Sequence, residues 1–411
     1  MKKSHYLLFM VMTLLHCQLV SAATTEVDGI KYEISKRGDV ATVIGYTGHH
    51  KIVSIPNSIT SNEVGYEVTT IGDKAFSGCT SLGSITIPNS VTAIGELAFM
   101  NCSRMTSITV GNSVKTIGYN AFLGCSGLTA VYISDLKAWC NIEFCDSEDA
   151  NPLYFAHQLY LDKSLVTHLN IPQSVINIGA YAFIGCTSLK SVTIPNTTKS
   201  IGYQSFAGCT HLESLEIGTS VTAISGGAFQ NCAHLYSAVI PHSVTIIGEY
   251  AFKNCVGINE LTIGRSVTSL GWYAFFGLED LTEVTCYATN IPSTNGNPFQ
   301  GVEQGNACLY VPEESVEKYQ SANNWKKFGT IKAIDVDQVK GITQRDINIR
   351  TSNGLINISG LDNNETIIFY SLTGQTIGTA KATSGTATFT TEPNSIIIAQ
   401  IGNKSFKITT R

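Results

Sequence analysis

A fixed spacing of 23 residues between cysteines is the feature that most restricts how this chain can fold. A phenylalanine stands three residues before each of these cysteines and keeps the same spacing. The cysteines are Cys79, Cys102, Cys125, Cys186, Cys209, Cys232 and Cys255, and the phenylalanines are Phe76, Phe99, Phe122, Phe183, Phe206, Phe229, Phe252 and Phe275, with Leu278 in the cysteine position of the last copy. A period of this length, kept over most of the chain, predicts a stack of similar units.

Each unit reads L-x-x-L-x-I-P-x-S-V-T-x-I-G-x-x-A-F-x-G-C, followed by two spacer residues. The segment L-x-x-L-x-I predicts a short strand with alternate side chains pointing inward, and the proline ends its hydrogen-bond ladder. The following glycine allows the chain to bend back, and x-x-A-F-x-G-C predicts a single helical turn. In the unit that starts at Leu82, the side chains predicted to point inward are Leu82, Ile85, Ile87, Val91, Ile94 and Phe99, with Cys102 beside them. One unit cannot enclose these side chains, so neighbouring units must cover them.

The period predicts ten coils and defines where the stack begins and ends. We place the repeat stack at residues 66–285, with a first weak coil near residues 50–60 and an insertion within residues 134–165. The ends of such a stack need covers. Alternating strand patterns predict an N-terminal cap over residues 23–65, and the loss of period predicts a C-terminal cap and linker over residues 286–340, including an amphipathic helix near residues 312–328.

The composition changes after residue 335, where cysteine and tryptophan no longer occur. Short runs rich in Ile and Thr are separated there by Gly and Asn turns. This pattern predicts a small all-β sandwich over residues 341–411.

The first 22 residues have the form of a secretory signal peptide. Lys2 and Lys3 precede an apolar run that is too short to span a bilayer, and small residues follow at Val20–Ala22. A lipoprotein signal that uses Cys17 is the alternative. No later run is apolar and long enough for a membrane span, and the chain, with a net charge of −5, has no basic patch that would favour nucleic acid.

These repeats resemble the 23-residue, treponemal-like leucine-rich repeats of the BspA-type bacterial surface family. The resemblance covers about residues 26–334 and includes the segments EVDGIKYEI, SDLKAWCNIEF and CLYVPEESVEKYQ. It implies a leucine-rich repeat solenoid with short parallel strands and one-turn helices, followed by the sandwich. It further implies a location at the surface or outer membrane of a bacterium, and adhesion to host proteins. The tail resembles a sorting domain of type IX secretion through IIFYSLTGQTIG, which implies surface anchoring.

The cysteines raise the question of metal binding. Metal ligands usually occur in pairs two to four residues apart, whereas these cysteines occur once per coil at an inward position. We therefore interpret them as buried thiols that pack like small apolar side chains, and we predict no metal site and no cofactor. Cys286 and Cys308, in the C-terminal cap, are the predicted disulfide in an oxidising compartment.

Aromatic residues fill the two positions before the A-F pair in several coils, and we call them the aromatic row: Tyr119, Tyr181, Tyr203, Tyr250, Trp272 and Tyr273. An exposed row of rings predicts a contact surface for protein or glycan. The alternative is that each ring lies flat on its neighbour and shields the core. Glu260 and Glu283 fall on neighbouring strands, which permits a glycosidase-like pair or, as we favour, a solvated pair.

No nucleophile, base and orienting group converge in the sequence pattern, so we predict that the protein is not an enzyme. The leading hypothesis is a secreted surface protein that binds host or extracellular-matrix proteins along its repeat stack. The alternative is a glycan-binding or structural envelope scaffold module.

Overall fold

The computed structural model describes residues 23–35, 39–145, 147–334, 348–352, 354–359, 361, 365–371, 375–383, 385–393, 395–401 and 404–410. The predicted signal peptide lies outside these residues. The chain forms two compact units, Met1–Asp335 and Val336–Arg411, each with its own apolar core. Each unit is described separately below.

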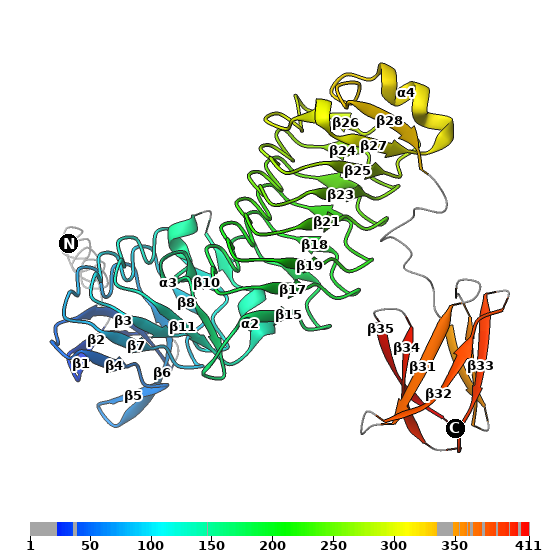
Figure 1. The fold of residues 1–411 in the computed structure, drawn as a ribbon. Coiled ribbons are helices and arrows are strands. Elements are labelled where there is room, and N and C mark those ends of the chain that lie inside the picture. The colour runs from blue at the N-terminus through cyan, green and yellow to red at the C-terminus, as the bar shows by residue number, and fades with distance from the viewer. Residues whose placement is uncertain are drawn as a thin grey trace, which may run out of the picture. The chain divides into compact units, whose positions relative to one another are not determined.

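The first unit is a solenoid whose coils stack through two parallel ladders of strands (Figure 1). The ladder of longer strands begins with β4 (Ile52–Ser54), β7 (Ser84–Thr86), β9 (Ser107–Thr109), β11 (Ala130–Ile133) and β13 (Leu159–Leu161), which β14 (Ser164–Leu165) closes. It continues with β15 (His168–Asn170), β17 (Ser191–Thr193), β19 (Ser214–Glu216), β21 (Ser237–Val239), β23 (Glu260–Ile263), β25 (Glu283–Cys286), β27 (Cys308–Val311) and β28 (Thr330–Ala333). These strands mark about 13 turns rather than ten, because the predicted C-terminal cap itself supplies further parallel strands.

The second ladder consists of shorter strands at the I-G segment of each coil. It comprises β8 (Ala93–Ile94), β10 (Thr116–Ile117), β12 (Glu143–Phe144), β16 (Asn177–Ile178), β18 (Ser200–Ile201), β20 (Ala223–Ile224), β22 (Ile246–Ile247), β24 (Ser269–Leu270) and β26 (Ser293–Thr294). Glycine follows most of these strands because the neighbouring coil leaves no room for a side chain. A Cβ on Gly271 would lie 2.2 Å from the backbone nitrogen of Glu249.

The core between the ladders confirms the inward pattern predicted from the sequence. All seven side chains predicted to point inward in the coil at Leu82 are buried. The phenylalanines form stacked columns, in which Phe206 lies 5.2 Å from Phe183 and 5.4 Å from Phe229 between ring centroids. Between coils, the outward Ser and Thr side chains pair in register, as Ser84 does with Ser107.

The x-x-A-F-x-G-C segment differs from the predicted one-turn helix. It forms consecutive turns because two of its residues have left-handed backbone conformations, such as Leu97 (φ 56°) and Asn101 (φ 60°). A right-handed helix cannot contain these residues. The turns instead bond across coils, and the Phe99 N–H donates to the Ala121 carbonyl oxygen at 2.8 Å.

The N-terminal cap is the predicted strand cluster. Antiparallel β1 (Ala23–Val27), β2 (Ile30–Ile34) and β3 (Val40–Tyr46) lead through β6 (Val64–Ile71) into the shorter ladder, and β5 (Ser58–Ser61) pairs with β6. The insertion forms α2 (Leu136–Cys140), η1 (Glu148–Ala150) and α3 (Leu153–Ala156).

The C-terminal cap contains a shorter helix than predicted. It comprises η2 (Gln304–Asn306), η3 (Glu313–Ser315) and α4 (Val316–Ser321). The helix ends at Ser321 because Ala322 is extended and Asn324 is left-handed, which turns Trp325 back into the core. Trp325 contacts Tyr319 and Phe299 edge-on at 5.0 and 5.2 Å between ring centroids, and these rings cover the end of the phenylalanine column.

The second unit is the predicted small β domain. One antiparallel sheet contains β29 (Asn348–Ser352), β30 (Leu355–Ser359) and β33 (Thr386–Thr390). The other contains β32 (Thr376–Lys381), β31 (Thr366–Ser371), β34 (Ile396–Ile401) and β35 (Lys404–Thr409). Apolar side chains from both sheets, including Ile356, Phe369 and Ile397, share one buried core.

Candidate binding surface

The structure separates the aromatic row into two positions with different surroundings. Tyr119, Tyr203 and Trp272 stand two residues before the alanine of their coils and are 51%, 43% and 48% exposed. These side chains point outward from the turn side of the solenoid. They are the members of the row that a partner can reach without rearrangement.

The other three members of the row pack against the solenoid. Tyr181, Tyr250 and Tyr273 directly precede the alanine and have left-handed backbone conformations. Tyr181 is buried, with its ring edge-on to Tyr203 at 5.6 Å, and Tyr250 lies 5.7 Å from Tyr273. The sequence analysis treated both positions as one row, and the repeat contains no signal that separates them, because Lys74, Leu97, Asn120, Gln204 and Gly227 also occupy the left-handed position.

Trp272 is held in place by an aromatic cluster. Its indole stacks on Tyr273 at 4.8 Å, and Tyr273 contacts Phe276 at 5.3 Å. The Lys253 ammonium lies 5.0 Å from the Tyr250 ring centroid, a cation–π distance that braces this cluster. Gly296 completes the site, since its φ of 76° suits glycine and an added Cβ would lie 2.7 Å from the indole.

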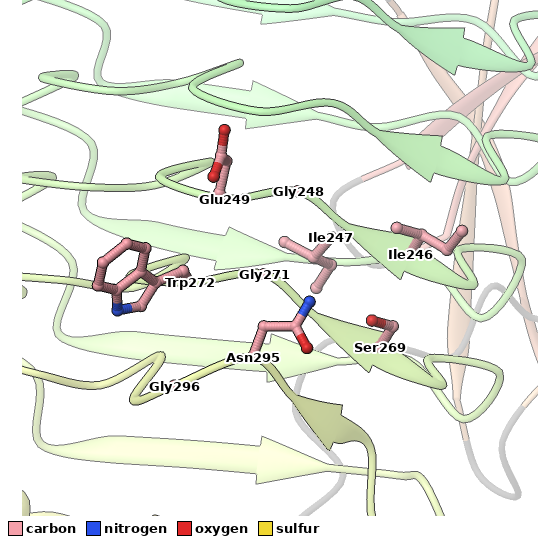
Figure 2. Close-up of a pocket in the computed structure, with 9 residues that line it drawn as sticks. All are labelled: Ile246, Ile247, Gly248, Glu249, Ser269, Gly271, Trp272, Asn295 and Gly296. Atoms are coloured by element: carbon pink, nitrogen blue, oxygen red, sulfur yellow. The ribbon is translucent and has the colours of Figure 1, made fainter.

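A groove of about 730 Å³ adjoins Trp272. Figure 2 shows the lining residues, which come from three successive coils: Ile246, Ile247, Gly248, Glu249, Ser269, Gly271, Trp272, Asn295 and Gly296. The Asn295 amide and the Ser269 hydroxyl point toward the glycine strip between the coils. The sequence analysis did not find this groove because its residues meet only through stacking.

The cysteine ladder is buried, as the inward positions predict. Cys102, Cys125, Cys209, Cys232 and Cys255 each donate the thiol proton to the carbonyl oxygen of the phenylalanine 26 residues earlier, at 3.0–3.3 Å. Burial raises the pKa of Cys186 to about 11 and holds the pKa of Cys209 well above its usual value. These thiols therefore stay protonated and act as packing groups.

The predicted disulfide between Cys286 and Cys308 is absent, and both cysteines are free. Cys286 is buried, and its sulfur lies 3.3 Å from the Tyr319 hydroxyl. Cys308 pairs instead with Glu283, in the outward row of the strand ladder, so the two cysteines belong to different faces of the coil. The sequence prediction was wrong because both cysteines lie on strands of the stack, and not in an irregular cap.

We expect the buried thiols to resist alkylation in the folded protein. The Cys186 thiol has a folded pKa of about 11 against an ordinary value of 9.0, so iodoacetamide at pH 8 should label the folded ladder at least about 100-fold more slowly than the denatured chain. Peptide mass spectrometry, with labelling in denaturant as the control, measures this. Equal labelling of Cys186 in both states would contradict a buried, protonated ladder. Since the unfolded thiol ionises first, stability should also fall as the pH rises from 9 to 11.

Comparison with known families decides the classification of these coils. The model of the BspA type leucine rich repeat region matches residues 54–149 and 155–301 in six copies, which is more than half of the chain. The chain belongs to the BspA-type leucine-rich repeat family. The matched region extends past residue 285, in agreement with the additional coils of the structure.

Solved structures similar to this BspA-type chain are bacterial leucine-rich repeat proteins. A leucine-rich repeat protein from Bacteroides ovatus shares 25% identity and a TM-score of 0.54, with 75% of this chain and 76% of that chain covered. A leucine rich cell surface protein from Faecalibacterium prausnitzii shares 22% identity and a TM-score of 0.40, with coverage of 77% and 96%. A Treponema pallidum leucine rich repeat protein shares 25% identity and a TM-score of 0.36, with coverage of 52% and 91%. No functionally curated protein matches this chain.

The other candidate sites of the BspA-type chain lie on open surface. Glu260 and Glu283 are paired directly across β23 and β25, and both side chains are exposed. Within the described ranges, no three His, Cys, Asp or Glu side chains gather as a metal site. No helix in the part of the chain that the structure describes has the length and apolar character to cross a membrane.

Proposed function

We propose that this chain is a secreted protein-binding module of the bacterial cell surface, an adhesin toward host or extracellular-matrix proteins. The observation that carries the proposal is the set of exposed rings Tyr119, Tyr203 and Trp272 on a stiff stack. Tyrosine and tryptophan are enriched among the residues that dominate the energy of protein interfaces. The family membership supports the surface location, and the repeat scaffold supports a role in binding without catalysis.

The stacked architecture favours binding through many modest contacts. Each ring is fixed by its coil, so little conformational entropy is lost when a partner covers it. Tyr203 rests on Tyr181, and Trp272 rests on Tyr273, so neither ring needs to reorganise. A role of the tail in sorting or anchoring, and cleavage of the signal peptide, remain predictions.

We expect the triple substitution Tyr119→Ala, Tyr203→Ala and Trp272→Ala to weaken binding to the matrix protein selected in a surface-plasmon-resonance screen by at least about 30-fold. That corresponds to about 2 kcal/mol, the loss typical of one interface anchor. The control is Tyr236→Ala, which removes an exposed ring on β21's side of the coil and outside the row. Equal affinity of the triple variant and the unchanged protein would contradict the proposal.

A further inference from the structure

The backbone that forms the floor of the groove beside Trp272 is fully engaged in the ladder. The N–H groups of Gly248 and Gly271 donate to the carbonyls of Ile224 and Ile247 at 2.8 Å, and the Asn295 N–H donates to Leu270 at 3.2 Å. A peptide cannot add to this surface as a further strand, because the floor offers no unpaired strand edge. A ligand of the groove must therefore be recognised through side chains.

The side chains around the groove keep their hydrogen-bonding groups available. The Trp272 indole N–H, the Ser269 hydroxyl and the Asn295 amide have no hydrogen-bond partner among the residues that the structure describes, and the Glu249 carboxylate is equally uncommitted. Together they supply donors and acceptors within three neighbouring coils, about 10 Å of stack. Such a mixed set suits a ligand whose groups each donate and accept, as hydroxyls do.

The groove also offers apolar surface at both ends. Ile246 is 50% exposed on one side, and the braced indole of Trp272 stands on the other (Figure 2). A sugar ring combines an apolar face of C–H groups with a rim of hydroxyls, which matches an indole beside an amide, a hydroxyl and a carboxylate. The single charged group of the lining, Glu249, disfavours anionic ligands.

We propose that this groove is a binding site for neutral saccharides, in which Trp272 packs against a sugar ring while Asn295, Ser269 and Glu249 bond its hydroxyls. This site goes beyond the protein-binding role proposed above. Two of its polar residues, Ser269 and Asn295, lie outside the aromatic row, so their substitution separates the two roles. The groove is open and covers few ligand atoms, so we expect dissociation constants of about 1 mM.

Trp272 provides a local reporter for this site. The chain has three tryptophans, and Trp139 and Trp325 are buried, so acrylamide quenching of the folded full chain reports mainly on Trp272. The probes are neutral oligosaccharides of glucose, galactose, mannose and N-acetylglucosamine, a sialylated oligosaccharide and a set of short peptides. We expect at least one neutral oligosaccharide to protect Trp272 saturably and the sialylated one to protect it less.

Variants test the assignment of the groove. Asn295→Ala with Ser269→Ala should weaken saccharide binding at least about 10-fold, since two hydrogen bonds are lost, and Glu249→Gln should narrow the discrimination against the sialylated probe. Tyr119→Ala, in the same coil position as Trp272 but remote from the groove, is the control and should leave saccharide binding unchanged. The proposal is overturned if no neutral saccharide protects Trp272, if only peptides protect it, or if the double variant binds as well as the unchanged protein.

Discussion

Replacing Phe206 with alanine is expected to lower the free energy of unfolding of the solenoid by about 3–5 kcal/mol. The ring is fully buried and stacks between Phe183 and Phe229 with interplanar angles of 11° and 5°. Its removal deletes the contacts to two coils at once and leaves a cavity that the neighbouring rings cannot fill, because each is fixed by its own coil. The damage should therefore extend to both neighbours.

Urea unfolding followed by circular dichroism measures this loss. Phe206→Leu keeps most of the buried volume and should cost clearly less than the alanine variant. Tyr236→Ala removes an exposed ring from the following coil and should change stability by at most about 0.5 kcal/mol. A Phe206→Ala protein as stable as the Tyr236→Ala protein would show that the phenylalanine column is not what holds the coils together.

The architecture of the solenoid was predictable because the period appears directly in the sequence. In the coil at Leu82, alternation placed Ile85 and Ile87 inward, and both are buried. Stacking then required their equivalents in the next coil to lie alongside, and Ile85 does pair with Ile108. Each such inference needs only local geometry and the rule that apolar side chains avoid water.

The last coils were harder to recognise because the spacing changes there. Phe275 stacks on Phe299, which lies 24 residues later instead of 23, and Leu278 replaces cysteine. The stack tolerates the additional residue since the turn absorbs it while the ring remains in the column. The sequence alone does not distinguish a slipped coil from a cap, so the end of the stack was placed too early.

The candidate sites were predictable only in part. Exposed rings were expected before the A-F pair, yet the left-handed residue of the turn sends Tyr250 and Tyr273 against the solenoid. A pattern of residue types does not reveal that backbone conformation, because Gly, Asn, Lys and Tyr all occur at this position. The groove depends on Ile246, Trp272 and Asn295, which are distant in sequence and are brought together by the stack.

Deleting one whole coil is expected to leave a folded protein, whereas deleting a smaller part of the same coil is expected to unfold the stack. Removal of Lys190–Leu212 joins Leu189 to Glu213, so that Leu189 takes the place of Leu212 and Phe183 meets Phe229. The register of both ladders is then restored, as β17 and β19 occupy equivalent positions. Stability falls only by the contribution of one coil and one interface.

Removal of Lys190–Ser200 takes away fewer residues but deletes the longer strand of the coil together with its inward Val192 and Ile194. The remaining half-coil cannot bridge the ladder of longer strands, and the apolar side chains of the coils on either side become exposed to water. Circular dichroism, gel filtration and binding of an apolar dye should show a compact whole-coil variant and an expanded, dye-binding half-coil variant. If the smaller deletion proved the less damaging of the two, the coil would not be the unit in which this protein folds, and the register of the ladders could not be the origin of its stability.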